Sequence, residues 1–305
     1  METLKFIFSR SNILFALSLL IGFFFPQAAS ISVLLILPAL MLIMTITPLK
    51  IPRGFFRRPK KLIVWAIYGN LMSYLLLGNI IIFTGVFFLR EEAFLLGMVL
   101  IAAMPPAVNM LSLSKTLRGD STNSIAGFAG AYLGALVIAP LLGLVFFRYS
   151  QMDYWLVLMI FLALVALPLA LSRLAVENDW DKITEPYEGW IIDCCFFIVF
   201  YTIAAKCRPL LFDWSYDMTL IIILAAAIVF GLPFAINKTG RIFNRGKNKI
   251  TPMLLLGTLK NHGLAGGIAV VVFPAEIAFA ALVFALMSFI FANIVLYMKA
   301  RKSSA

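Results

Sequence analysis

The stretch LKNHGLAGG, residues 259–267, interrupts a long and otherwise mostly apolar part of this chain. It contains a lysine, an asparagine, the only histidine of the protein and three glycines. Each glycine lowers helix stability by about 1 kcal/mol relative to alanine. The stretch therefore predicts a break in a helix at a place where polar side chains need partners.

The composition around this stretch is that of an integral membrane protein. Hydrophobic residues make up 63% of the 305 residues and charged residues only 13%, whereas soluble domains have about 45–50% and 25%. A helix needs about 20 apolar residues to cross the hydrocarbon, and the apolar runs here have that length, which outer-membrane barrels lack. We expect an all-α polytopic protein with ten transmembrane helices at residues 12–28, 31–48, 62–89, 93–117, 121–147, 152–173, 188–205, 215–237, 250–273 and 275–298.

The positive charges predict how these helices are oriented. With the N-terminus in the cytoplasm, 20 of the 25 Lys and Arg residues fall on the inside, four on the outside, and Lys260 within a span. This bias lies in short loops, where the positive-inside rule applies. We therefore expect a protein of the cell membrane whose N- and C-termini are both cytoplasmic. The net charge of +11 is then explained by a basic cytoplasmic face that lies against anionic lipid. It therefore does not indicate a nucleic-acid partner.

The first span has an alternative reading. Lys5 and Arg10 precede an apolar run, and Gln27-Ala28-Ala29 resembles a cleavage site, so this segment could be a signal peptide. The charge count favours a retained helix. Elsewhere, the three cysteines have no spacing that suggests a metal site, so we expect no metal and no cofactor.

The ten spans divide into residues 1–148 and 149–305, with five helices each. Because five is odd, two similar sets would insert in opposite orientations and form an inverted repeat, a recurrent plan in secondary transporters. The fourth span is interrupted by Met104-Pro105-Pro106-Ala107-Val108-Asn109 and the ninth by its opening stretch. Discontinuous helices at corresponding positions indicate a binding site near the middle of the membrane.

The polar residues at the two breaks are the candidate binding groups. Asn109 and Asn261 can each donate and accept hydrogen bonds. Lys260 is too deep in its span to reach the headgroups easily, and such a lysine nearly always faces the protein interior or water. His262 could titrate near neutral pH, which leaves proton coupling open. Asp193 is the one acid clearly within a helix and is a candidate charge partner for Lys260, although it could also lie in a water cavity or near the headgroups.

These residues resemble those of the bile acid:sodium symporter family. Residues 260–265, KNHGLA, look like the Gln-Asn-Ser-Gly-Leu-Ala crossover of its ninth helix. Residues 105–109, PPAVN, followed by Leu117-Arg118-Gly119-Asp120, are similar to its fourth-helix crossover and the Arg-Gly-Asp/Asn ending. The resemblance implies a panel of spans 1, 2, 6 and 7 that moves against a core of spans 3–5 and 8–10. Auxin efflux carriers and arsenite exporters share this plan more distantly.

The departures from the family concern its sodium sites. The resemblance implies sodium ligands that include a ninth-helix glutamate and a glutamine four residues later, and these positions are Leu256 and Lys260 here. A serine of the fourth helix is replaced by Val108, and a threonine of the fifth by Phe128. Ser124 is retained, and the third-helix glutamine aligns with Asn70.

We therefore expect a secondary transporter that moves a small organic solute, favouring an anion, by alternating access. With the carboxylate lost and an ammonium gained, Lys260 would act as a built-in cation, and transport would not depend on sodium. The expected binding residues are Asn109, Lys260, Asn261 and His262, supported by Thr258, Ser124 and Asn70. A sodium symporter with unrecognised ligands, a channel and a receptor remain alternatives. An enzyme is disfavoured, because one histidine and few acids within the spans provide no catalytic set.

Overall fold

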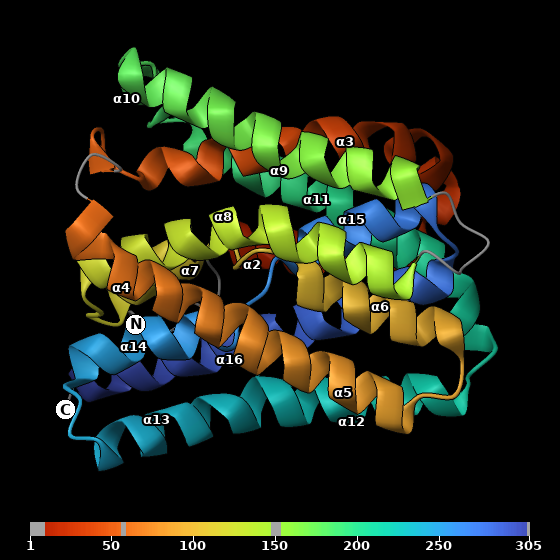
Figure 1. Ribbon diagram of the computed structural model, residues 1–305. Helices are drawn as coiled ribbons and strands as arrows, with labels where there is room; N and C mark the ends of the chain where they lie inside the picture. Colours follow the sequence, from red (N-terminus) through yellow and green to blue (C-terminus); the bar gives the residue numbers. More distant parts are fainter. Residues whose placement is uncertain (1–9, 56–58, 148–153, 304–305) are drawn as a thin grey trace.

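The computed structural model describes residues 10–55, 59–147 and 154–303, and its regular elements there are almost all helical. The helices run lengthwise through the molecule (Figure 1). In the first half they are α2 (Arg10–Phe24), α3 (Ala29–Ile46), α4 (Pro59–Asn70), α5 (Asn79–Phe88), α6 (Glu92–Ala103), α7 (Met110–Thr116) and α8 (Ser121–Phe146). In the second half they are α9 (Tyr154–Glu177), α10 (Asp181–Thr184), α11 (Glu188–Cys207), α12 (Tyr216–Ala226), α13 (Leu232–Ile242), α14 (Lys247–Leu256), α15 (His262–Val272) and α16 (Ala275–Ser303).

Seven helical segments of the described residues are long and apolar enough to cross a membrane. They are residues 26–50, 62–88, 121–146, 155–177, 188–212, 216–242 and 275–301. Three shorter apolar helices are α2, α6 and α15. The polytopic helical class is thus confirmed, while the expected ten crossings and the orientation in the membrane remain predictions. The expected boundary between the two repeats, near residue 148, lies outside the described residues.

The fourth and ninth expected spans each consist of two helices. Residues 93–117 form α6 and α7, which are separated at Met104–Asn109, and residues 250–273 form α14 and α15, which are separated at Gly257–Asn261. Pro105 and Pro106 explain the first break, because proline has no N–H and its ring clashes with the preceding turn. In the second, the backbone leaves the helix after Leu256 and the side chain of Asn261 accepts a hydrogen bond from the Leu264 amide to start α15.

Two long helices contain a π-helical segment. Residues 71–78 join α4 to α5, and residues 227–231 join α12 to α13. These helices are the third and eighth of the ten expected spans, so the π segments and the breaks recur in the same order in both halves. Single π-helical turns inside α-helices are frequent at functional sites. This recurrence is consistent with a repeat, whose inverted orientation remains a prediction.

A stripe of glycines brings α4 and α8 into close contact. A Cβ atom at Gly130 would lie 2.5 Å from Ala66 Cα, and Gly127 faces Gly69 across the same contact. Small residues let helices approach closely in membranes, where the hydrophobic effect does not drive their association. The contact brings Asn70 on α4 against α8, where its side-chain amide donates to the carbonyl of Gly130 at 2.9 Å.

The helix contacts define two groups of helices, and each group contains helices from both halves of the chain. Helices α2 and α3 pack against α11, and α3 also packs against α9. Most remaining contacts join α4–α8 to one another, α12–α16 to one another, and α6 to α15 and α16. We call these groups the panel (α2, α3, α9, α11) and the core (α4–α8, α12–α16). Their movement against each other remains a prediction.

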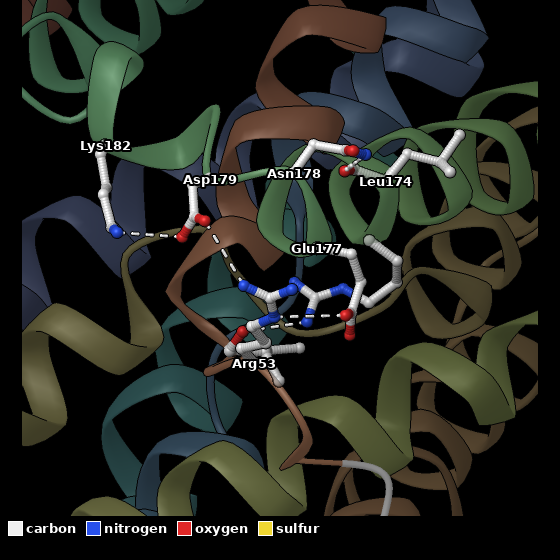
Figure 2. A network of polar contacts seen from close by, with 8 residues as sticks. Arg53, Leu174, Glu177, Asn178, Asp179 and Lys182 are labelled. Atoms are coloured by element: carbon white, nitrogen blue, oxygen red, sulfur yellow. Dashed lines mark hydrogen bonds and ion pairs between the residues drawn. The ribbon is translucent and has the colours of Figure 1, made fainter.

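Charged side chains from segments distant in sequence meet at one end of the bundle. We call the end where α7 finishes and α14 begins the basic end. Here Arg173 donates hydrogen bonds to the carbonyls of Pro48 and Ile51. Figure 2 shows Arg53 between Glu177 and Asp179 at this end, with Lys182 paired to Asp179. These cations come from separate segments that were all expected on the inside. At the opposite end, which we call the far end, α6 begins (Figure 1).

Candidate functional site

The two helix breaks cross each other and are joined as a short antiparallel pair. Pro106 and Lys260 are bridge partners. The Ala107 amide donates to the Leu259 carbonyl at 3.2 Å, and the Asn261 amide donates to the Pro105 carbonyl at 2.9 Å. Each break therefore satisfies backbone groups that the other leaves open. This is the condition under which irregular backbone survives inside a membrane.

The Lys260 side chain is the centre of this crossing. It is only 1% exposed, and its Nζ donates to the carbonyl of Ala102 at 2.9 Å and to that of Met104 at 2.8 Å. The same atom lies 3.9 Å from the centre of the Tyr74 ring. The two carbonyls belong to the C-terminal end of α6, where the helix dipole favours a cation. The ammonium is thus bound by peptide oxygens and an aromatic face rather than by a carboxylate.

Asn261 and His262 lie beside the lysine and are buried. The Asn261 side chain caps α15 through its oxygen, at 3.0 Å from the Leu264 amide, and its Nδ2 lies 3.2 Å from Met44 Sδ on α3. The His262 Nε2 lies 3.0 Å from Ser288 Oγ on α16. His262 Nδ1 is buried with no hydrogen-bond partner among the described residues. One nitrogen of the ring is therefore free to bind a further polar group.

Glycines after His262 allow the panel helices to pack closely against α15. A Cβ atom at Gly263 would lie 2.9 Å from the Phe196 ring of α11, and one at Gly267 would lie 2.7 Å from Leu40 of α3. The absence of side chains on this face of α15 lets both panel helices contact it directly. Gly263, Gly266 and Gly267 therefore lie within α15 and serve a close helix contact, and the expectation that they interrupt the helix is wrong, since the break lies before them at 257–261.

Thr258, Ser124 and Asn109 were also expected at the site, and the structure gives each of them a different environment. Thr258 is buried and its hydroxyl donates to the Leu254 carbonyl at 2.7 Å, within its own helix turn. Ser124 lies 2.7 Å from Ser114, a contact between α8 and α7. Asn109 is exposed and begins α7 without a side-chain cap. The structure thus brings Lys260, Asn261 and His262 together and places Asn109 facing outward at the other side of the break.

Asp193 has a different partner from the one considered in the sequence analysis. Its carboxylate accepts a hydrogen bond from Arg10 Nε at 2.8 Å, and Arg10 also lies over the Trp190 ring. This ion pair joins α2 to α11 at the basic end. Asp193 is therefore the charge partner of Arg10, and not of Lys260, whose hydrogen bonds go to carbonyls.

A polar cleft opens at the basic end between the panel side and the core. Its volume is about 520 Å³, within the range of about 300–1,000 Å³ that is usual for small-molecule sites. One wall carries Asp181, Glu185 and Glu188, and the other carries Ser112, Lys115, Ser121 and Ser124. Lys50 Nζ reaches Ser112 Oγ at 3.2 Å. Of the expected site residues, Ser124 lines this cleft.

The sequence analysis missed Tyr74, Met44 and Ser288, which contact Lys260, Asn261 and His262. They lie on three other helices, so their proximity depends on tertiary packing. A weak signal was available for Tyr74, because a buried tyrosine hydroxyl in an apolar span needs a partner. It donates to the Ala131 carbonyl at 2.8 Å, which positions the ring under the lysine.

The positions that the resemblance assigns to sodium ligands are apolar and buried. Leu256 is 1% exposed and Phe128 is fully buried. Leu256 packs against Gly127, and Phe128 packs against Tyr132 with ring centres 4.5 Å apart. Among the described residues, no group of three or more His, Cys, Asp or Glu side chains could hold a metal ion.

Comparison with known proteins finds similarity among solved structures. No protein-family model and no curated protein sequence matches the chain. Among solved structures, the chain is similar to the sodium proton antiporter MjNhaP1 from Methanocaldococcus jannaschii, with a TM-score of 0.48 and 13% sequence identity. The alignment covers 94% of this chain and 90% of that one.

Proposed function

We propose that this chain is a secondary transporter that moves a small organic anion by alternating access, and that Lys260 replaces a bound sodium ion. The observation that carries the proposal is the contact between the Lys260 ammonium and the Ala102 and Met104 carbonyls. A cation is held at the end of a discontinuous helix, at the point where two such helices cross. Crossing helices of this kind build the substrate and ion sites of many transporters.

The surroundings of the lysine support sodium independence. Sodium is a hard cation that prefers several oxygen ligands, and Leu256, Phe128 and Val108 provide no side-chain oxygen at the positions in question. The ammonium already occupies the carbonyl oxygens at the end of α6. A sodium ion placed there would be repelled by it. Sodium symport would therefore need ligands elsewhere.

The cleft and the free nitrogen of His262 support transport of a polar solute. The cleft at the basic end has the size of a small-molecule site and lies between the panel side and the core. The Lys260 charge makes the crossing electropositive, which favours an anion. His262 Nδ1 offers one further polar contact. An anionic group that reaches the crossing would thus have a cation and an imidazole to bind.

The sodium hypothesis can be tested without knowing the solute. The melting temperature of the purified protein is measured against sodium, with potassium at the same ionic strength as control. A ligand that binds only the folded state raises apparent stability by RT ln(1 + [L]/Kd). We expect no sodium-specific rise for the wild type and a rise for Lys260→Gln combined with Leu256→Glu. Lys260→Gln combined with Leu256→Gln is the matched control without a carboxylate and should not respond.

A sodium-specific rise in the wild type would overturn the replacement of sodium by lysine. Transport itself is tested in proteoliposomes with small carboxylates and sulfonates that raise the melting temperature. We expect saturable uptake that Lys260→Gln weakens at least tenfold. Flux that rises linearly with concentration would instead indicate a channel. Uptake that requires an imposed pH gradient would identify proton coupling.

A further inference from the structure

We propose that residues 238–249, which are the end of α13, the turn after it and the start of α14 and are called the connector below, form a binding surface for anionic phospholipid headgroups. It carries five cations in twelve residues: Lys238, Arg241, Arg245, Lys247 and Lys249. No Asp or Glu occurs anywhere between residues 218 and 275. The connector lies at the basic end of the molecule, at the lower left of Figure 1.

The cations of this connector are free of internal partners. Residues 241–249 are all exposed, and among the described residues none of the five cations has a carboxylate within ion-pair distance. Asp120 is close in the backbone, since its amide donates to the Asn248 carbonyl. Its carboxylate instead accepts from the Asn123 amide at 2.9 Å and caps α8. The positive charge of the connector is therefore available to an external anion.

The length of the preceding helix places these cations at headgroup depth. The segment Tyr216–Ile242 has 27 residues, which at 1.5 Å per residue is about 40 Å. The hydrocarbon core is only about 30 Å thick, and the bilayer with its headgroups is about 40–45 Å thick. The last turn of α13 thus leaves the hydrocarbon and enters the layer that contains the phosphates.

Two exposed apolar side chains accompany the charges. Ile242 is 68% exposed and Phe243 is 71% exposed, directly beside Arg241. Basic and apolar residues together at the interface are typical of segments that bind anionic lipid, because the rings and chains enter the headgroup boundary while the cations bind phosphate. Because these side chains lie at the depth of the headgroups, they face lipid rather than bulk water. Lipid is therefore favoured over a soluble protein as the binding partner.

The backbone of the connector is ordered by its own hydrogen bonds. The Arg245 amide donates to the Gly240 carbonyl at 2.9 Å, and the Ile250 amide donates to the Gly246 carbonyl at 3.1 Å. Asn244 adopts a left-handed conformation with φ of 51°, which asparagine tolerates better than most residues. The side chain of Ile250 packs on Gly240 and holds α13 against α14. The cations are therefore presented on a fixed turn.

The test uses the full-length protein in a neutral detergent. Short-chain phosphatidylglycerol, phosphatidylcholine and inorganic phosphate are titrated separately while the melting temperature is recorded. The connector variant replaces Arg241, Arg245, Lys247 and Lys249 with Gln. The control variant has the same net charge and replaces Arg53, Arg118, Lys182 and Lys299 with Gln. A third variant, Ile242→Ser with Phe243→Ser, keeps every charge.

We expect phosphatidylglycerol to raise the melting temperature more than phosphatidylcholine does, and this difference to shrink in high salt. The connector variant should bind phosphatidylglycerol at least about tenfold more weakly, since each cation near an anionic surface contributes measurably. The control variant should keep most of the difference, and the serine variant should lose part of it. The proposal fails if the connector variant binds as the wild type does, or if inorganic phosphate alone gives the full effect. In phosphatidylcholine the connector and serine variants should unfold like the wild type, because the replaced side chains are exposed. The control variant loses the ion pairs of Arg53 and Lys182, so its lipid response is compared with its own melting temperature in phosphatidylcholine.

Discussion

Lys260 at the crossing and Arg53 at the basic end are both cations with two oxygen partners, but their surroundings are opposite. Lys260 is buried and binds peptide carbonyls at 2.8 and 2.9 Å. Arg53 is about half exposed and binds the carboxylates of Glu177 and Asp179 at 3.3 and 3.4 Å, as Figure 2 shows. Water can replace the partners of Arg53 but cannot easily reach those of Lys260. The contribution of each cation to the free energy of unfolding therefore depends more on its burial than on the charge of its partners.

The largest expected effect is that of Lys260→Met. Methionine fills similar volume but leaves the Ala102 and Met104 carbonyls without a donor, and a buried unpaired polar group costs about 1–3 kcal/mol. We expect the free energy of unfolding to fall by about 3 kcal/mol. Lys260→Gln should lose less, because its amide can still donate. Unfolding in mixed micelles measures both, and equal losses would show that the carbonyl contacts do not matter.

Asp217 extends the comparison to a buried anion. It is 1% exposed, and its carboxylate accepts from the backbone amides of Arg90 and Glu91 at 2.9 and 2.7 Å, just before α6 begins. It thus holds the far end of α6, whose other end binds Lys260. We expect Asp217→Asn to lower the unfolding free energy by about 1–2 kcal/mol, because the bonds lose their charge assistance. Asp217→Ala should cost more in the same unfolding assay, and an unchanged Asn variant would contradict this assignment.

Arg53→Gln should have a smaller effect, below about 1 kcal/mol, because the ion pairs of Arg53 are exposed. The effect should also disappear in 1 M salt, where the screening length is about 3 Å. By contrast, the loss caused by Lys260→Met should persist at the same salt concentration. Melting temperatures of both variants at low and high salt therefore test the comparison directly. A salt-insensitive Arg53 effect would mean that this network is more protected than its exposure indicates.

The smallest effect concerns pH. The hydrogen bond from Lys182, and then its charge, lower the pKa of the Asp179 carboxyl below its usual value. A lowered carboxyl pKa contributes stability that is complete at neutral pH and is lost as the pH falls through that value. The difference in melting temperature between the wild type and Asp179→Asn should therefore be constant from pH 8 to 5. It should decrease only below about pH 4. Asparagine suits this test, because Asp179 has a φ of 60°, which asparagine also adopts.

The sequence predicted the helices and their breaks well, because apolar length, proline and glycine act locally. Pro105-Pro106 mark the interruption at 104–109, whereas the second interruption, at 257–261, lies just before the glycines that pointed to it, which are part of α15. The partners of the charged groups were not predictable in this way. Asp193 binds Arg10 and Lys260 binds α6 because of how helices distant in sequence pack together. The exposed position of Asn109 likewise depends on the direction in which α7 leaves the crossing.

The pairing of Pro106 with Lys260 has a consequence for biosynthesis. The Lys260 ammonium binds carbonyls that precede it by 156 and 158 residues. While the chain is being made, α6 must therefore enter the membrane long before the cation that satisfies its C-terminal end has been translated. Contacts between such distant residues form late and slowly. Until then the first break has to rely on water, lipid headgroups or the insertion machinery, and helices α2–α8 alone form an incomplete folding unit.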